Sequence, residues 1–198
     1  MSYATISDVR AALGRQGTAP PEWAAKMLHV VPDLPIVADR KAYLVEKARG
    51  KVVLDIGCTG PISAAIRAAA TTYYGVDTVA GTGVTVCDLD VAPQTMPRHA
   101  DVEMVIASEL LEHLANPGRF LDALHEAYLG IPVYLTVPHA GAYQVKNGTH
   151  EVVNREHVAW YSYTTLATLL RRSGYRMDLA RWYHGQPHTA EGLIVEAR

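Results

Sequence analysis

The sequence predicts an α/β fold built on a doubly wound, mostly parallel sheet of seven strands. From Lys51 onward, short β-branched runs alternate with helical patterns, which is the order that a parallel sheet requires. The first unit is the clearest, because the strand-like run 51–56 is followed by a glycine-containing loop and the alanine-rich run 62–70. The chain has 198 residues, of which 49% are hydrophobic, and this is enough for a single domain with its own core.

The other elements follow from the same patterns. Strands are expected at 51–56, 72–76, 83–87, 102–107, 131–137, 177–183 and 192–196. Helices are expected at 5–15, from Pro20 onward, and at 39–48, 62–70, 110–114, 117–128 and 163–173. Only a short loop joins the last two strands, so we expect them to pair antiparallel. We therefore expect one domain over 1–198, in which 1–50 form a helical N-terminal cover and 51–198 form the core that binds a cofactor.

Charge and composition limit the partners of the chain. The formal net charge of −2 gives no bulk electrostatic reason to bind nucleic acid or an anionic membrane. The sequence has no apolar run long enough to span a membrane, and its first ten residues lack a signal-peptide pattern. Cys58 and Cys87 are expected to be free thiols in a reducing cytoplasm. We expect a cytoplasmic monomer or homodimer whose partner is a small molecule, with RNA left open as an alternative.

Three acids stand at the ends of predicted strands, where parallel strands share one rim. Asp55 ends the first strand, Asp77 follows the second and Asp88 follows the third. Asp77 suits a ribose diol, because one carboxylate can accept both hydroxyl protons. Asp88 suits the amino group of an adenine, and the neighbouring Leu89 suits packing against its ring. The sequence thus predicts a site for a nucleoside cofactor.

The loop 57–61 indicates which nucleoside cofactor this is. It reads Gly57-Cys58-Thr59-Gly60-Pro61 and lacks the G-x-G-x-x-G spacing of a dinucleotide site, which disfavours an oxidoreductase. Asp55 would place negative charge beside the phosphates of a dinucleotide. The same acid suits S-adenosylmethionine, which carries an ammonium and a sulfonium.

The segment from Lys51 onward resembles the class I S-adenosylmethionine-dependent methyltransferases that carry a Leu-Glu-His motif after the fourth strand. The motifs that carry the resemblance lie at 53–58, 75–77, 87–89, 106–114, 154–157 and 161–174. The resemblance implies a Rossmann-like methyltransferase sheet and S-adenosylmethionine as the cofactor. It implies cofactor contacts from Asp55, Gly57, Cys58, Thr59, Gly60, Asp77, Asp88, Leu89 and Ser108. One departure is that Thr59 stands where the family loop usually has a glycine.

A glutamate–histidine cluster follows the fourth strand. Glu109, Glu112 and His113 are spaced i, i+3 and i+4, so on a helical turn they share one face, and we expect the loop 138–156 to bring His157 back to the same rim. Two carboxylates and two imidazoles can bind a divalent metal such as Mg²⁺ or Mn²⁺. The set resembles the metal ligands of small-RNA ribose 2′-O-methyltransferases and of polyprenyl catechol O-methyltransferases. Without metal, His113 or His157 can act as a general base, or His157 can only position a loop.

The acceptor is expected on the same rim. His139 follows the fifth strand directly and is a further catalytic or substrate-contact candidate, and Tyr143, Trp160 and Tyr161 can stack on a flat acceptor. Aromatic residues near loops also serve as plain packing, and that alternative stays open. No Asn-or-Asp-Pro-Pro-Tyr element follows the fourth strand, which argues against methylation of a base amino group. The predicted function is methyl transfer to a small-molecule hydroxyl. A metal-dependent RNA 2′-O-methyltransferase and a non-catalytic S-adenosylmethionine-binding protein are the alternatives.

Overall fold

The structure is a computed structural model, and it describes residues 33–140, 156–184 and 191–198. The chain divides into two units, Met1–Val31 and Pro32–Arg198, and every described residue belongs to the second. The predicted helices at 5–15 and from Pro20 lie outside the described residues, as do Tyr143 and most of the loop 138–156. Within the described part, no helix is long and apolar enough to cross a membrane.

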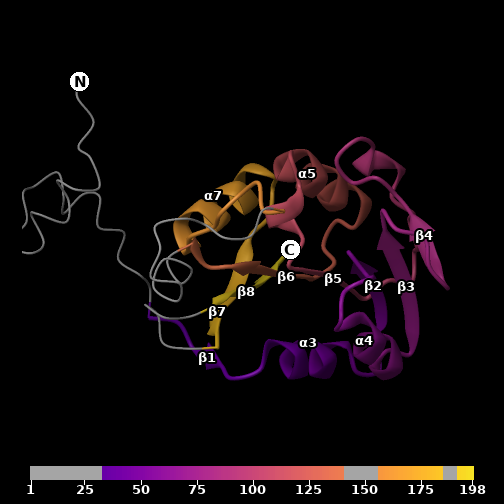
Figure 1. Cartoon of the computed structure of the whole chain (residues 1–198), viewed down its shortest axis with the longest axis horizontal. Helices are drawn as coiled ribbons and strands as arrows, with labels where there is room; N and C mark the ends of the chain where they lie inside the picture. Colours follow the sequence, from indigo (N-terminus) through magenta and orange to yellow (C-terminus); the bar gives the residue numbers. More distant parts are fainter. Residues whose placement is uncertain (1–32, 141–155, 185–190) are drawn as a thin grey trace, which may run out of the picture. The chain divides into compact units, whose positions relative to one another are not determined.

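One eight-stranded sheet forms the centre of the second unit, in the order β1-β7-β8-β6-β5-β2-β3-β4 (Figure 1). The strands are β1 Ile36–Val37, β2 Val52–Ile56, β3 Thr72–Asp77, β4 Val84–Val86, β5 Met104–Ser108, β6 Val133–Pro138, β7 Met177–Tyr183 and β8 Gly192–Ala197. Every pair of neighbours is parallel except those that include β8, which runs antiparallel to β6 and β7. The predicted fold class is confirmed, including the antiparallel pairing of the last two strands.

Strand β2 is the point where the strand order reverses. It pairs with β3 on one side and with β5 on the other, and both partners run parallel to it. Its sequence, VVLDI, is almost entirely buried, as expected of a central parallel strand covered on both faces. Ligands of such sheets bind outside the carboxyl ends of the strands at this reversal, so the fold places the site after Ile56.

Helices cover both faces of the sheet: α3 Arg40–Ala48 and α4 Ser63–Ala69 lie on one face, and α5 Pro117–Ala127 and α7 Tyr163–Arg172 lie on the other (Figure 1). Polar side chains cap the N-termini of α3 and α7. The Asp39 carboxylate accepts from the backbone N–H groups of Lys41 and Ala42. Ser162 and Thr165 form a reciprocal capping box at α7. These caps explain why α3 and α7 begin one residue after Asp39 and Ser162.

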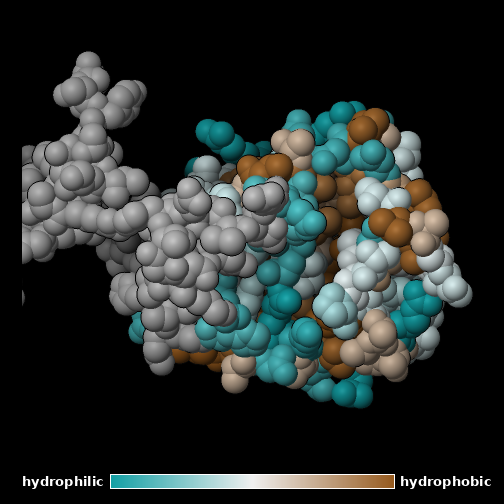
Figure 2. Space-filling view, in the orientation of Figure 1, coloured by the Kyte–Doolittle hydropathy of each residue, from teal (hydrophilic) through white to brown (hydrophobic). Residues whose placement is uncertain are grey.

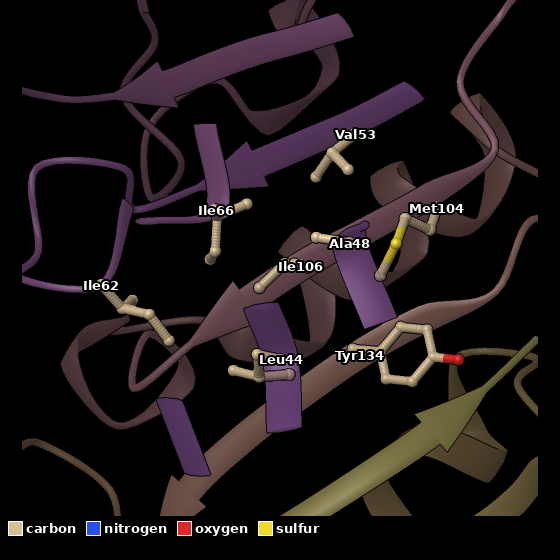
Figure 3. Packing of buried hydrophobic residues seen from close by; sticks show 8 residues of the cluster. All are labelled: Leu44, Ala48, Val53, Ile62, Ile66, Met104, Ile106 and Tyr134. Carbon is tan, nitrogen blue, oxygen red and sulfur yellow. The ribbon is translucent and has the colours of Figure 1, made fainter. Parts of the chain in front are cut away.

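Helix α3 packs into the core of the sheet (Figure 3). Its residues Leu44 and Ala48 are fully buried. They belong to a cluster whose other members are Val53, Ile62, Ile66, Met104, Ile106 and Tyr134. Strand β1, just before α3, pairs parallel with β7 at the sheet edge. The sheet therefore begins at Ile36, before the predicted start of the core at Lys51. The strand was missed because two residues beside Pro35 show no alternating pattern.

Candidate active site

A cavity of about 220 Å³ opens at the predicted rim of the sheet. It is lined by Gly57, Asp77, Thr78, Asp88, Leu89, Asp90, Leu110, His113 and Leu114. Gly57 directly follows β2 and has a positive φ of 78°, a conformation that glycine adopts without the strain of a side chain. Figure 2 shows hydrophobic residues, in brown, among hydrophilic ones, in teal, on one face of the described part of the chain. Val79 and Val91, which follow Asp77 and Asp88 by two and three positions, are more than half exposed.

Asp77 is held firmly at the end of β3. Its Oδ2 accepts from the Thr59 backbone N–H at 3.0 Å and from the Thr59 hydroxyl at 2.9 Å. Its Oδ1 accepts from the Val79 N–H at 3.0 Å and from the Thr78 hydroxyl at 3.4 Å. Burial raises the pKa of this carboxyl, but the hydrogen bonds from Val79 and Thr59 outweigh burial and hold the pKa below its ordinary value. Asp77 therefore carries a negative charge on the cavity wall at neutral pH.

Asp55 is placed differently from Asp77. It is 2% exposed, and its Oδ2 accepts from the Tyr73 hydroxyl at 2.7 Å. Burial raises the pKa of this carboxyl above its ordinary value, although the hydrogen bond from Tyr73 opposes the shift. Asp55 does not line the cavity in the described part of the chain. Its carboxylate ties β2 to β3, and its contact with a cofactor stays a prediction.

The other predicted cofactor residues divide into two groups. Gly57, Asp88 and Leu89 line the cavity, and their contact with a nucleoside stays a prediction. The Asp88 Oδ1 also accepts from the backbone N–H groups of Asp90 and Val91, and this fixes the turn after β4. The second group, which does not line the cavity among the described residues, consists of Cys58, Thr59, Gly60 and Ser108. Cys58 and Cys87 are both free, as expected, and both are buried.

Glu109 does not share a helical face with Glu112 and His113, which corrects the expectation of a helix at 110–114. The Glu109 N–H still bonds the carbonyl of Thr136, so the chain stays paired to β6 through this residue. Glu109 then adopts a positive φ of 54°, and only a short 3₁₀ turn, η2 Leu111–His113, follows. Because this bond keeps Glu109 paired to β6, the helical turn begins only at Leu111. Glu109 therefore does not align with Glu112 at the expected i, i+3 spacing.

The Glu109 carboxylate is bound by three residues from other elements. Its Oε1 lies 2.6 Å from Nη1 of Arg40 and accepts from the hydroxyls of Thr136 at 2.9 Å and Tyr183 at 3.0 Å. Burial lowers the pKa of Arg40, but the Glu109 charge outweighs it and raises the pKa further above its ordinary value. Glu109 thus serves as the centre of a charged network between α3, β6 and β7, a role different from the metal ligand predicted for it.

Glu112, His113 and His157 come together beside the cavity. One ligand atom from each residue lies within 4.8 Å of the others, and the two imidazole rings are 4.7 Å apart between centroids. The Glu112 carbonyl accepts from the N–H groups of Val158 and Ala159, and these bonds bring His157 to η2. Of these three residues, His113 also lines the cavity. The structure thus brings together three of the four residues of the predicted glutamate–histidine cluster.

The chemistry of this three-residue cluster fits a divalent cation. Glu112 is 1% exposed, and neither of its carboxylate oxygens has a hydrogen-bond partner within the described residues. Burial, together with the charge of Glu109, raises the pKa of Glu112 to about 8. Burial and the neighbouring His113 lower the pKa of His157, which keeps its imidazole neutral near pH 7. Once it loses its proton, the Glu112 carboxyl offers an oxygen ligand beside the ring nitrogens of the two histidines, and such an ion uses these oxygen and nitrogen ligands.

The described residues among the predicted acceptor contacts each contact another residue of the chain. His139 is buried, with its ring 4.8 Å from that of Trp182. The hydroxyl of Tyr161, also buried, donates to the Leu111 carbonyl at 3.2 Å and so helps to hold η2. The ring of Trp160 lies 5.0 Å from that of His157. Trp160 thus lies beside the histidine pair, and contact of any of these residues with an acceptor stays a prediction.

Several residues near the site were not predicted. Thr78, Asp90, Leu110 and Leu114 line the cavity beside predicted neighbours. A wider window around each predicted strand end would have included them. Arg40 is different, because nothing in its local sequence indicates that it reaches the end of β5.

A cavity lined by carboxylates at the reversal of a doubly wound sheet is typical of proteins that bind nucleoside cofactors. The family model described as a methyltransferase domain matches residues 28–180. The match covers well over half of the chain, so the chain belongs to the methyltransferase domain family. The class I S-adenosylmethionine-dependent methyltransferase predicted from the motifs is thereby confirmed. No curated protein matches the chain in sequence.

Solved structures share this fold at low sequence identity. The 1,6-didemethyltoxoflavin-N1-methyltransferase of Burkholderia thailandensis is 18% identical, with a TM-score of 0.59 over 80% of this chain and 75% of that one. The magnesium protoporphyrin IX methyltransferase of Synechocystis PCC 6803 is 15% identical, with a TM-score of 0.57 over 79% and 78%. The small RNA methyltransferase HEN1 is 13% identical, with a TM-score of 0.65 over 80% of this chain but 25% of that one.

Proposed function

We propose that the chain transfers the methyl group of S-adenosylmethionine to a hydroxyl group of a small molecule. The cavity supports the cofactor, because the ionised Asp77 suits a ribose and Leu89 suits an adenine ring. The neighbours from Burkholderia thailandensis and Synechocystis both hold S-adenosylhomocysteine, and the former also holds its small-molecule substrate, 1,6-didemethyltoxoflavin.

One observation carries the choice of a hydroxyl acceptor: His113 lines the cavity, and its ring lies against that of His157. Methyl transfer from a sulfonium is a direct displacement, so alignment of the two substrates supplies much of the rate. A hydroxyl must also lose its proton, and an imidazole of this pair is suited to accept it. The lowered pKa of His157 keeps its imidazole, which lies against that of His113, in the neutral form near pH 7.

The second candidate is a metal-dependent RNA 2′-O-methyltransferase. It is favoured by the cluster of Glu112, His113 and His157, which would hold the ion. A metal at this position would lower the pKa of a bound hydroxyl and orient it toward the methyl group. The net charge of −2 gives no general attraction for RNA, so a small-molecule acceptor is the preferred proposal.

Binding and turnover test these proposals in order. Calorimetry should show that S-adenosylhomocysteine binds and that a nicotinamide dinucleotide does not. Turnover is then measured with a panel of phenols, sugars and RNA 3′ ends, with and without a chelator. Methylation of a small hydroxyl compound supports the first candidate, and chelator-sensitive methylation of RNA supports the second. Failure to bind S-adenosylhomocysteine would overturn both.

A histidine variant tests the role of the imidazole. His157→Ala should lower turnover by about a hundredfold, the usual contribution of a general base, with little change in binding of S-adenosylhomocysteine. His99→Ala is the control, because His99 stacks on Tyr74 and does not line the cavity. Full activity of His157→Ala would reject both the base and the metal-ligand roles of this residue.

The cellular setting is part of the proposal. The two buried, free cysteines fit a reducing compartment, which supports a cytoplasmic enzyme. A monomer or homodimer is proposed, and its mass in solution is measurable by light scattering.

A further inference from the structure

The carboxylate of Asp77 is fully occupied by donors from the protein itself. An ionised carboxylate has about four acceptor positions, two on each oxygen. Thr59 donates to Oδ2 with both its backbone N–H and its hydroxyl, and Val79 and Thr78 donate to Oδ1. A ribose diol that binds to Asp77 must therefore displace donors that are already there.

The four donors differ in how easily they can leave. The N–H groups of Thr59 and Val79 belong to the backbone of the two loops, so their release would require the loops to move. The two threonine hydroxyls can leave by a rotation about χ1 alone. The Thr59 hydroxyl bond is short, at 2.9 Å, whereas the Thr78 bond is 3.4 Å long and weak.

We propose that the Thr59 hydroxyl occupies the position of one ribose hydroxyl on Asp77, and that nucleoside binding must turn it away. This inference rests on the proposed function, since it takes Asp77 as the acid that binds the ribose. Thr59 then sets the affinity for the cofactor and reduces discrimination between ribose and deoxyribose. The Thr59 N–H keeps its bond to Oδ2 throughout, so the loop stays attached while the hydroxyl leaves.

Calorimetry with S-adenosylhomocysteine tests the proposal. Thr59→Val keeps the β-branched shape and removes the hydroxyl, so it should bind about tenfold more tightly, the effect of one hydrogen bond to a charged group. Thr59→Ser keeps the hydroxyl and should bind like the unchanged protein. Thr78→Val should give a smaller gain, and Thr85→Val, an exposed residue of β4, should give none.

Ligands with one ribose hydroxyl removed supply a second, independent readout. The unchanged protein should bind S-adenosylhomocysteine and one of its 2′-deoxy or 3′-deoxy analogues almost equally, because Thr59 replaces the lost hydroxyl. Thr59→Val should prefer the intact ribose by about tenfold.

The outcomes separate this inference from the proposed function. If no variant binds S-adenosylhomocysteine, the proposed function fails. If the ligand binds and Asp77→Asn abolishes binding, but Thr59→Val binds no more tightly than the unchanged protein, only the role of Thr59 is overturned. Thermal unfolding of each unliganded variant confirms that the compared proteins are folded.

Discussion

Arg40 and Glu109 form an ion pair of 2.6 Å between the first residue of α3 and the residue that follows β5. The pair is mostly buried, with 16% and 28% of the two side chains exposed. It directs Glu109 toward α3, whereas Glu112 lies beside the two histidines. The ion pair thus links the packing of α3 to the composition of the candidate metal cluster.

Removal of Arg40 should destabilise the fold. Arg40→Ala should lower the free energy of unfolding by about 2 kcal/mol, because the partly buried Glu109 charge loses its partner but keeps two hydroxyl donors. Urea denaturation measures this difference. The matched control is Arg49→Ala, whose pair with Glu46 is well exposed and should contribute less than about 1 kcal/mol. Equal stability of the two variants would contradict a structural role for the Arg40 pair.

Helix α3 should be essential to the core, although the sequence placed it in a cover. Leu44→Ala removes a fully buried side chain from the cluster in Figure 3 and should cost about 2–5 kcal/mol of unfolding free energy. Leu129→Ala changes a leucine that is 74% exposed and should cost far less. A loss below about 1 kcal/mol at Leu44 would show that α3 packs loosely on the sheet.

The lowered pKa of Asp77 predicts an acid dependence of stability. The pKa in the folded state lies below the ordinary value of 3.8, so the carboxylate stabilises the fold fully above pH 3.8. This contribution is lost as the pH falls through the folded-state pKa. Asp77→Asn should therefore be less stable than the unchanged protein near pH 7, and the gap should narrow below pH 3.8. Thermal melts across this range test it, and a gap independent of pH would contradict it.

Metal binding should depend on Glu112 and be largely independent of Glu109. A calorimetric titration with Mn²⁺ should show that the unchanged protein binds the ion. Glu112→Gln should bind Mn²⁺ at least tenfold more weakly, because a ligand of the cluster is lost. Glu109→Gln is the matched control, since its carboxylate is bound by Arg40, Thr136 and Tyr183. An equal loss of Mn²⁺ affinity in both variants would support the set of four metal ligands predicted from the sequence. No Mn²⁺ binding in the unchanged protein would favour the histidine pair as a metal-free base.

Local sequence patterns were sufficient for most of the fold. All seven predicted strands are present, because short runs rich in apolar and β-branched residues, such as 52–56, favour buried strands. The placement of Asp77 and Asp88 on the cavity followed from topology alone, since the carboxyl ends of parallel strands meet at one rim. The helix expected at 110–114 was wrong, because a backbone bond to β6 at Glu109 outweighed the local helical preference.

The sequence by itself therefore determined the order of elements, the rim and the acids that stand on it, because each depends on neighbours along the chain. Only the tertiary structure decided where those side chains turn. Glu109 meets Tyr183 from 74 positions away, Asp55 faces Tyr73, and Thr59 binds Asp77. Such contacts depend on which elements pack side by side and on which donors compete for one carboxylate. The spacing of residues within a single strand or helix does not indicate which donor will bind a given carboxylate.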